Sequence, residues 1–266
     1  MPASRRHGAA RSPATAKTAD RTLDVFELFA AEQRPLNLSE ISELLRIPLS
    51  SSHALLKTLQ ARGYLYDVGR RQGYFPTKRM EDITHAIARA APVLAVVRPT
   101  LSALRDETDE TVVLAKRQGD EVTYVDVWES ARTVRWSTFA GEIKPLHSTS
   151  SGKAILSGLA PQALKEVLGR LPFERRTDAT ITSARELREQ IEKGRGRGWY
   201  QSIGETVAEL MAVSGPARIA GEVYAVTIGG PTTRFKPLMA RHVAALLRAR
   251  ARIEGRASAS GKRGTR

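Results

Sequence analysis

Residues 35–65, PLNLSEISELLRIPLSSSHALLKTLQARGYL, carry the pattern that decides the fold of the first part of the chain. Asn37 followed by Glu40 is typical of an N-cap with a capping box, and the apolar residues after it share one helical face. A further helix is expected over residues 50–62, which have apolar residues at helical spacing. The link between these helices, RIPL, is long enough only for a tight turn. The stretch therefore predicts a helix-turn-helix.

The flanking segments extend this unit at both ends. Thr22 is expected to cap an earlier helix with an apolar stripe formed by Leu23, Phe26 and Phe29. After the third helix, two β-prone pieces at residues 64–66 and 73–75 are separated by a polar turn that contains two arginines. Three helices and a basic hairpin predict a winged helix-turn-helix over residues 21–79.

Acidic and basic residues are unevenly distributed in this segment. The acidic residues lie on the first two helices, whereas the charged residues of the third helix are all basic. A recognition helix needs small or hydrogen-bonding side chains at its N-terminal end, where it meets base edges in the major groove. The alternative, in which the serines only start a helix, is weakened by the turn and the basic hairpin beside them. We expect DNA contacts from Ser50, Ser51, Ser52, His53, Lys57, Arg62, Arg70, Arg71 and Lys78, with Ser51 and Ser52 as candidates for base contact.

The remainder of the chain predicts a linker and an α+β domain. Residues 80–91 have a helical pattern, and we assign residues 80–97 to the linker between the domains. Further helices are expected from Pro99 to about Asp109 and at 150–158, 161–168, 183–195 and 236–253. Strands are expected at 111–116, 121–128, 133–139, 211–219 and 222–229. This mixture indicates an antiparallel sheet with helices over residues 98–253.

Composition limits the classes of protein that fit. The chain has 266 residues, of which 41% are hydrophobic, and a formal net charge of +14, which favours a polyanionic partner. It has no cysteine, so it lacks disulfides and cysteine-based metal sites. We expect disordered basic ends at residues 1–20 and 254–266. Without an apolar run of membrane length or a signal peptide, we expect a cytoplasmic protein with no membrane partner.

The order and spacing of several motifs resemble those of one family. Residues 35–65 and GYFPTKRM at 73–80 resemble the winged helix of IclR-family transcription regulators. DEVTYVDVWES at 120–130, PLHSTSSGKAILSGL at 145–159 and GPARIAGEVYAVTIGGP at 215–231 resemble that family's C-terminal part. The resemblance implies a GAF/PAS-like effector-binding domain that takes small organic or aromatic acids. It also implies dimers or tetramers that bind palindromic sites in double-stranded DNA, as a repressor or an activator.

The resemblance places an effector site at Ser150, Ser151, Ser202, Ala212, Thr227 and Gly229. Ser202 stands where the family often has an acidic residue, Ala212 where it commonly has cysteine, and Gly229 where it has serine. Because Ala212 and Gly229 remove polar atoms and add room, we expect an anionic effector larger than a two- or three-carbon acid. Its carboxylate would be bound by the four hydroxyls and by the N-terminus of the helix that starts at Ser150. Trp128, Trp136 and Phe139 either line this cavity or pack in the core.

Two alternatives differ in function. An enzyme is not expected: SSGKA at 150–154 lacks the features of a phosphate loop, and the five histidines show no metal-ligand spacing. We therefore expect no catalytic residue, no metal and no cofactor. The GRGRG run at 194–198 is interpreted as a turn. The second alternative is a regulator of the same fold whose C-terminal domain is degenerate and independent of ligand.

Overall fold

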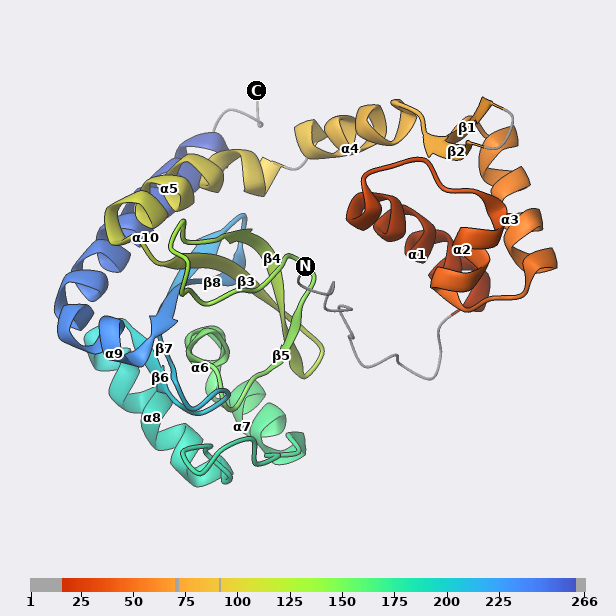
Figure 1. Ribbon diagram of the computed structural model, residues 1–266. Helices are drawn as coiled ribbons and strands as arrows, with labels where there is room; N and C mark the ends of the chain where they lie inside the picture. Colours follow the sequence, from red (N-terminus) through yellow and green to blue (C-terminus); the bar gives the residue numbers. More distant parts are fainter. Residues whose placement is uncertain (1–15, 70–71, 91, 262–266) are drawn as a thin grey trace. The chain divides into compact units, whose positions relative to one another are not determined.

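The computed structural model describes residues 16–69, 72–90 and 92–261 (Figure 1). The chain divides into two compact units, residues 1–90 and 91–266.

The first unit has three helices, a two-stranded wing and a fourth helix. Its elements are α1 (Lys17–Glu32), α2 (Leu38–Leu45), α3 (Leu49–Ala61), β1 (Leu65–Gly69), β2 (Gly73–Pro76) and α4 (Arg79–Ala90). Strands β1 and β2 pair antiparallel. The core consists of Val25, Phe29, Leu36, Ile41, Leu56, Leu59 and Leu65. The predicted winged helix-turn-helix is confirmed.

Local contacts explain how α2 begins and how the wing attaches. The side chain of Asn37 accepts a hydrogen bond from the Glu40 N–H at 3.0 Å, and the Glu40 carboxylate accepts one from the Asn37 N–H at 2.8 Å. The predicted capping box is thus confirmed. Leu36 forms a β-bridge with Tyr74 of the wing. Gly73 allows this approach, because a Cβ there would lie 2.2 Å from the carbonyl oxygen of Leu36.

Helix α1 begins earlier than the sequence predicts. The Thr22 hydroxyl donates to the carbonyl oxygen of Thr18 at 2.8 Å, so Thr22 lies inside the helix and is not its N-cap. The helix starts at Lys17, and residues 17–20, which we expected to be disordered, are helical. The rest of the predicted N-terminal arm, residues 1–15, lies outside the described residues.

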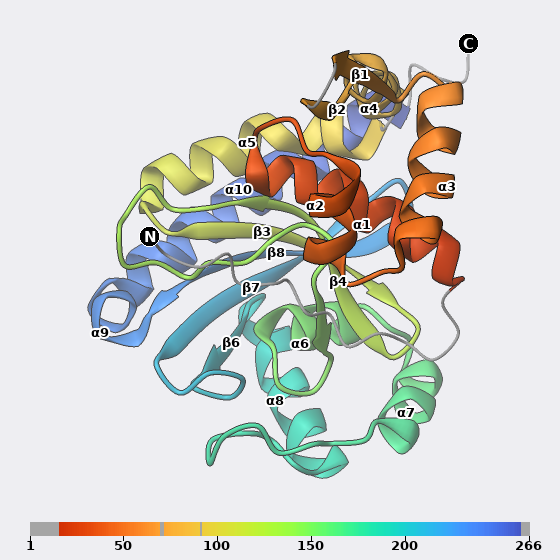
Figure 2. The same cartoon turned by 45° about the vertical axis from the view of Figure 1, so that its right-hand side comes forward.

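The second unit is a six-stranded antiparallel sheet with helices on both faces. Its strands are β3 (Thr111–Gln118), β4 (Glu121–Trp128), β5 (Ile143–Pro145), β6 (Tyr200–Ile203), β7 (Leu210–Ile219) and β8 (Glu222–Pro231), in the order β5-β4-β3-β8-β7-β6. Its helices are α5 (Pro92–Thr108), α6 (Ser150–Ser157), α7 (Pro161–Arg170), α8 (Ala184–Arg197), α9 (Thr232–Phe235), the 3₁₀ helix η1 (Lys236–Leu238) and α10 (Met239–Gly261). Helices α5 and α10 cover one face, and α6 packs on the other with α7 and α8 around it (Figures 1 and 2). The predicted α+β class is confirmed.

One predicted strand is a loop, and two short strands were missed. Residues 133–139 form no strand, and the side chain of Val134 is 67% exposed. Their polar groups bond to nearby side chains instead, since Glu129 accepts from the Ser137 hydroxyl at 2.6 Å and from the Thr138 N–H at 3.1 Å. Strands β5 and β6 are three and four residues long, too short for a periodic signal.

The expected domain boundaries also shift. Helix α5 starts at Pro92 and runs through Pro99, across the predicted boundary at residue 98, and Val97 is fully buried in the core of the second unit. At the other end, α10 continues to Gly261, so residues 254–261 are helical rather than disordered. Residues 262–266 lie outside the described part of the chain.

Within the described ranges, no single helix is long and apolar enough to cross a membrane. One bent pair, Arg79–Ala88 with Val93–Thr108, passes the same test of length and composition.

Candidate functional site

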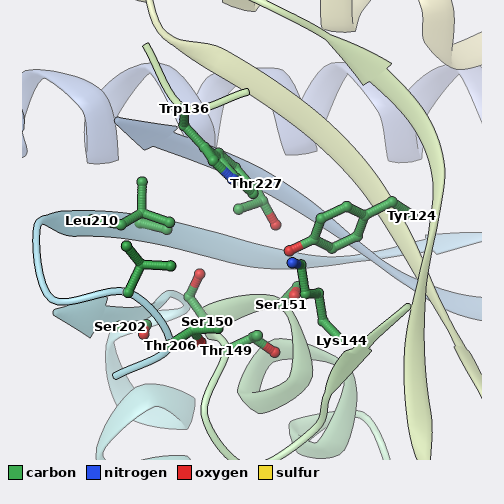
Figure 3. A pocket seen from close by; sticks show the side chains of 12 residues that line it. Tyr124, Trp136, Lys144, Thr149, Ser150, Ser151, Ser202, Thr206, Leu210 and Thr227 are labelled. Atoms are coloured by element: carbon green, nitrogen blue, oxygen red, sulfur yellow. The ribbon is translucent and has the colours of Figure 1, made fainter. Parts of the chain in front are cut away.

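A cavity of about 50 Å³ lies between the sheet of the second unit and the N-terminus of α6 (Figure 3). Its lining residues are Tyr124, Trp136, Lys144, Thr149, Ser150, Ser151, Ser202, Thr206, Val207, Leu210, Ala212 and Thr227. Five of the six residues predicted for the effector site are among them. The sixth, Gly229, lies behind the indole of Trp136.

Helix α6 presents its first turn to this cavity. Thr149 is the N-cap: its hydroxyl accepts from the Gly152 N–H at 3.1 Å and donates to the carbonyl of Pro145 at 2.8 Å. The main-chain N–H groups of Ser150 and Ser151 have no acceptor within the helix, because they precede its first turn of hydrogen bonds. Gly152 is required by packing, since a Cβ there would lie 2.1 Å from the Leu146 carbonyl oxygen.

Three hydroxyls form a chain from the sheet to this helix. Ser214 on β7 is fully buried, and its hydroxyl donates to that of Ser150 at 2.8 Å. The Ser214 proton is therefore used, so in the 2.8 Å contact between Ser214 and Thr227 the Thr227 hydroxyl is the donor. Ser150 accepts in this chain, so its own proton is not used in it. Sequence reasoning missed Ser214, because only the β7–β8 register places it opposite Thr227.

Two other hydroxyls hold the segment before α6. Ser202 donates to the carbonyl oxygen of Ser148 at 3.1 Å, and Thr206 donates to the same oxygen at 2.8 Å. We expected Ser202 to donate to the effector, but its proton is directed to the backbone. In this arrangement it can only accept a hydrogen bond from a ligand.

Among the described residues that line the cavity, only Lys144 is charged. Its ammonium lies 2.5 Å from a carboxylate oxygen of Glu142, and Figure 3 shows Lys144 and Tyr124 among the side chains that line the cavity. Burial first, and then the charge of Glu142, raise the pKa of Tyr124, and a hydrogen bond with Ser151 opposes that rise. The phenol thus stays protonated and can donate. Lys144 lies outside the motifs quoted above, and Tyr124 lies within DEVTYVDVWES at 120–130 but was not singled out as a site residue.

The room expected at Gly229 is occupied. A Cβ on Gly229 would lie 2.5 Å from Cε3 of Trp136, whose ring makes an edge contact with Tyr124 at 5.9 Å between centroids. The expectation that glycine enlarges the cavity was wrong, because the indole fills the space. Trp136 therefore lines the cavity, while Trp128 packs against the core on the α5 side and Phe139 is half-buried.

In the first unit, the exposed face of α3 carries three of the predicted DNA-binding residues: Ser50, His53 and Lys57. Ser52 is fully buried, and its hydroxyl donates to the carbonyl of Pro48 at 3.3 Å. The prediction that Ser52 contacts a base is therefore wrong for this conformation. Successive residues on a helix differ by about 100° in direction, so a run of serines cannot share one face.

The other predicted DNA contacts differ in position. Ser51 and Arg62 line a groove of about 720 Å³ between α1, α3 and the start of α4, with Phe26 and Met80 on its other walls. Lys78 is exposed at the end of the wing, 3.8 Å from Asp82. Arg70 and Arg71 lie outside the described residues.

The arrangement resembles that of known regulators in both units. Residues 18–69 match the model of the IclR helix-turn-helix domain, and residues 85–253 match that of the bacterial transcriptional regulator IclR C-terminal domain. The chain belongs to the IclR family. Its family is one of DNA-binding transcription regulators, and the expectation that the chain is not an enzyme is confirmed by its relatives.

Individual family members show the extent of the similarity. The chain is 31% identical to the HTH-type transcriptional regulator BhcR of Paracoccus denitrificans, covering 81% of this chain and 78% of that protein. It is 27% identical to the transcriptional repressor IclR of Escherichia coli, over 87% and 86% of the two chains.

Solved structures of the family share the fold. The crystal structure of Thermotoga maritima IclR gives a TM-score of 0.76 at 24% identity, covering 90% of this chain and 97% of that one. An IclR homologue from Microbacterium hydrocarbonoxydans, complexed with 4-hydroxybenzoate, gives a TM-score of 0.69 at 22% identity, covering 91% and 99%. No group of three or more histidines and carboxylates in the described ranges could hold a metal ion.

Proposed function

We propose that the cavity at the start of α6 binds a small carboxylate, and that this ligand controls DNA binding by the winged helix. The observation that carries the proposal is the convergence of hydrogen-bond donors and positive charge on one small space. Ser150, Ser151 and Lys144 all line it: the first two supply N–H groups at the start of a helix, Ser150 has a hydroxyl proton not used in the Ser214 chain, and Lys144 has an ammonium that also contacts Glu142. A buried carboxylate needs such donors, because desolvation without them is costly.

The size of the cavity favours a smaller ligand than the sequence suggested. Its volume of about 50 Å³ is a third of the roughly 150 Å³ of an engineered cavity that binds benzene. A carboxylate of two or three carbons fits this space better than an aromatic acid. The larger effector expected from Ala212 and Gly229 is therefore not favoured, since Trp136 fills the space beside Gly229.

The DNA-binding role is assigned to the exposed face of α3 and to the wing. We propose that Ser50 and His53 approach base edges, while Lys57 and Lys78 approach phosphates. Because the family implies dimers, the site is expected to be a palindrome with half-sites about one or more helical turns apart.

We propose that the groove between α1 and α3 joins two copies of this chain. Leu23 on its border is 61% exposed, and Phe26, Leu55 and Ile83 also line it. An isologous contact through this surface would bring two α3 helices to adjacent half-sites.

The test combines binding and DNA release. Calorimetric titration of the full-length protein with acetate, lactate and benzoate should give heat with the first two. A mobility-shift assay on DNA upstream of its own gene should then respond to the same acids. If no carboxylate binds while DNA binding is normal, the second unit is a ligand-independent domain of the same fold.

A further inference from the structure

We infer that Trp136 sets the maximum size of the effector, and that residue 229 is glycine because it must accommodate its indole. The pocket then accepts compact aliphatic carboxylates and excludes aromatic acids. This inference rests on the proposed function and names the class of ligand for the same cavity.

The first evidence is the fit between the indole and the sheet below it. Ala212 on β7 pairs directly with Gly229 on β8. A Cβ on Gly229 would lie 2.5 and 2.7 Å from Cε3 and Cζ3 of Trp136, and 3.3 Å from the Cβ of Ala212. Contacts below 3.0 Å cannot form, and an indole is a rigid group that cannot bend away. Any side chain at residue 229 is therefore incompatible with this position of the ring.

The second evidence is that the backbone around Trp136 is held in place. Its carbonyl oxygen accepts from the hydroxyl of Thr111 at 2.6 Å. The carbonyl of Val134 accepts from Arg234 at 3.0 Å, and Arg234 also makes two hydrogen bonds to Glu110, at 2.7 and 2.8 Å. Glu110 is 1% exposed, so this bidentate pair is fixed at the start of β3. These bonds fix the main chain from which the indole projects, so the ring starts from a defined position beside the cavity.

The third piece of evidence is that the indole occupies space in which the ring of an aromatic ligand could lie. It forms a wall of the cavity and packs edge-on against Tyr124, at 5.9 Å between ring centroids and 83° between ring planes. An indole is larger than a benzene ring, so its removal would leave room for one. Trp136 thus occupies the volume that an aromatic acid would need next to the carboxylate donors.

The decisive experiment compares Trp136→Ala with the parent by calorimetric titration of the full-length protein with acetate and with benzoate. We expect the parent to bind acetate and the variant to gain benzoate affinity by at least about 10-fold, because an aromatic ring becomes buried. Trp199→Ala is the matched control, since Trp199 stacks on Arg197 and does not line the cavity. It should gain nothing.

The outcomes separate the two proposals. If the parent and Trp136→Ala both bind acetate while benzoate affinity does not rise, the size limit is overturned and the carboxylate site stands. If neither protein binds either acid, both proposals fail. Benzoate binding to the parent at the variant's affinity also overturns the size limit.

A double-mutant cycle tests the pairing without any ligand. Gly229→Ala should lower the melting temperature of the parent, because the new Cβ collides with the indole. In Trp136→Ala, the same substitution should have little effect. Equal losses in both backgrounds would show that the two residues are not coupled. If Trp136→Ala does not fold, Trp136→Leu takes its place in both experiments.

Discussion

Lys153 and Glu205 form an ion pair inside the second unit, with 2.6 Å between the ammonium nitrogen and a carboxylate oxygen. Their side chains are only 1% and 8% exposed. The ammonium also donates to the side-chain oxygen of Gln190 at 2.7 Å and to the carbonyl of Gln201 at 3.0 Å. The pair thus connects α6 to the segment that carries Thr206, so it fixes two walls of the cavity relative to each other.

Replacing one partner of this pair should destabilise the protein severely. Burial lowers the pKa of Lys153 and raises that of Glu205, so each charge depends on the other. Lys153→Met leaves a buried carboxylate and is expected to lose about 3–5 kcal/mol in urea denaturation. The double variant Lys153→Met/Glu205→Leu should recover most of that loss. A single variant as stable as the parent would contradict this account.

The hydroxyl chain predicts coupled effects on carboxylate affinity. Ser214→Ala removes the donor that orients Ser150, and Thr227→Val removes the donor to Ser214. Each should weaken acetate binding by about 5-fold or more in calorimetric titration. Because the two hydrogen bonds act in series, the fold-loss of acetate affinity in the double variant should be much smaller than the product of the fold-losses in the two single variants. Thr84→Ala, which removes an exposed hydroxyl on α4 that does not line the cavity, is the control and should leave affinity unchanged. Independent losses would show that the chain is not a unit.

Stability should fall in mildly acidic solution because of His242. This residue is fully buried against Phe235, and within the described part of the chain neither ring nitrogen has a hydrogen-bonding partner. Burial lowers its pKa, and the nearby charges of Glu110, Arg241 and Arg234 act in opposing directions. Below the ordinary histidine pKa of about 6.5, the unfolded chain therefore binds a proton that the folded chain does not.

The melting temperature should therefore drop as pH is lowered from about 7.5 to about 5.5, through the ordinary histidine pKa. His242→Phe should reduce this slope. The slope should not vanish, because burial also lowers the pKa of His147. An unchanged slope in His242→Phe would exclude His242 as the cause.

The exposed face of α3 predicts which substitutions affect DNA binding. Lys57→Ala should weaken binding in a mobility-shift assay, and the affinity of the parent should fall by orders of magnitude between about 50 and 200 mM salt. Ser50→Ala should alter sequence preference more than non-specific affinity. Ser52→Ala, at a buried position, should leave affinity nearly unchanged in a folded protein. A strong loss in Ser52→Ala with none in Lys57→Ala would reject this orientation of the helix.

The groove between α1 and α3 predicts an oligomer. Light scattering at micromolar concentration should give the mass of a dimer or tetramer. Leu23→Glu, which places a charge on the exposed border of the groove, should reduce that mass. Leu238→Glu is the control, because Leu238 is 40% exposed on the second unit. A parent that stays monomeric even with operator DNA present would reject the proposed interface.

Sequence alone predicts the parts of the molecule that depend on local order. The capping box at Asn37 and the apolar periodicity of α3 involve neighbours in the chain, and both are present. Ser52 was misplaced because the direction of a side chain depends on the phase of the helix. Residues 133–139 were misassigned because strand-like residues there bond to Glu129 and Thr111. Ser214 and the fit of Trp136 to Gly229 depend on register between distant segments, which no local pattern encodes.

The centre of the sheet has a consequence for synthesis of the chain. Strand β3 pairs with β8, so that Thr111 lies beside Gly229 and Val113 beside Thr227. While β3, β4 and α6 leave the ribosome, the edge of β3 that pairs with β8 has no partner. That edge stays unpaired until β8 has been translated, near the end of the unit. The winged helix is made earlier, from contacts within its own 90 residues. A nascent regulator therefore acquires the unit that binds DNA before the cavity exists.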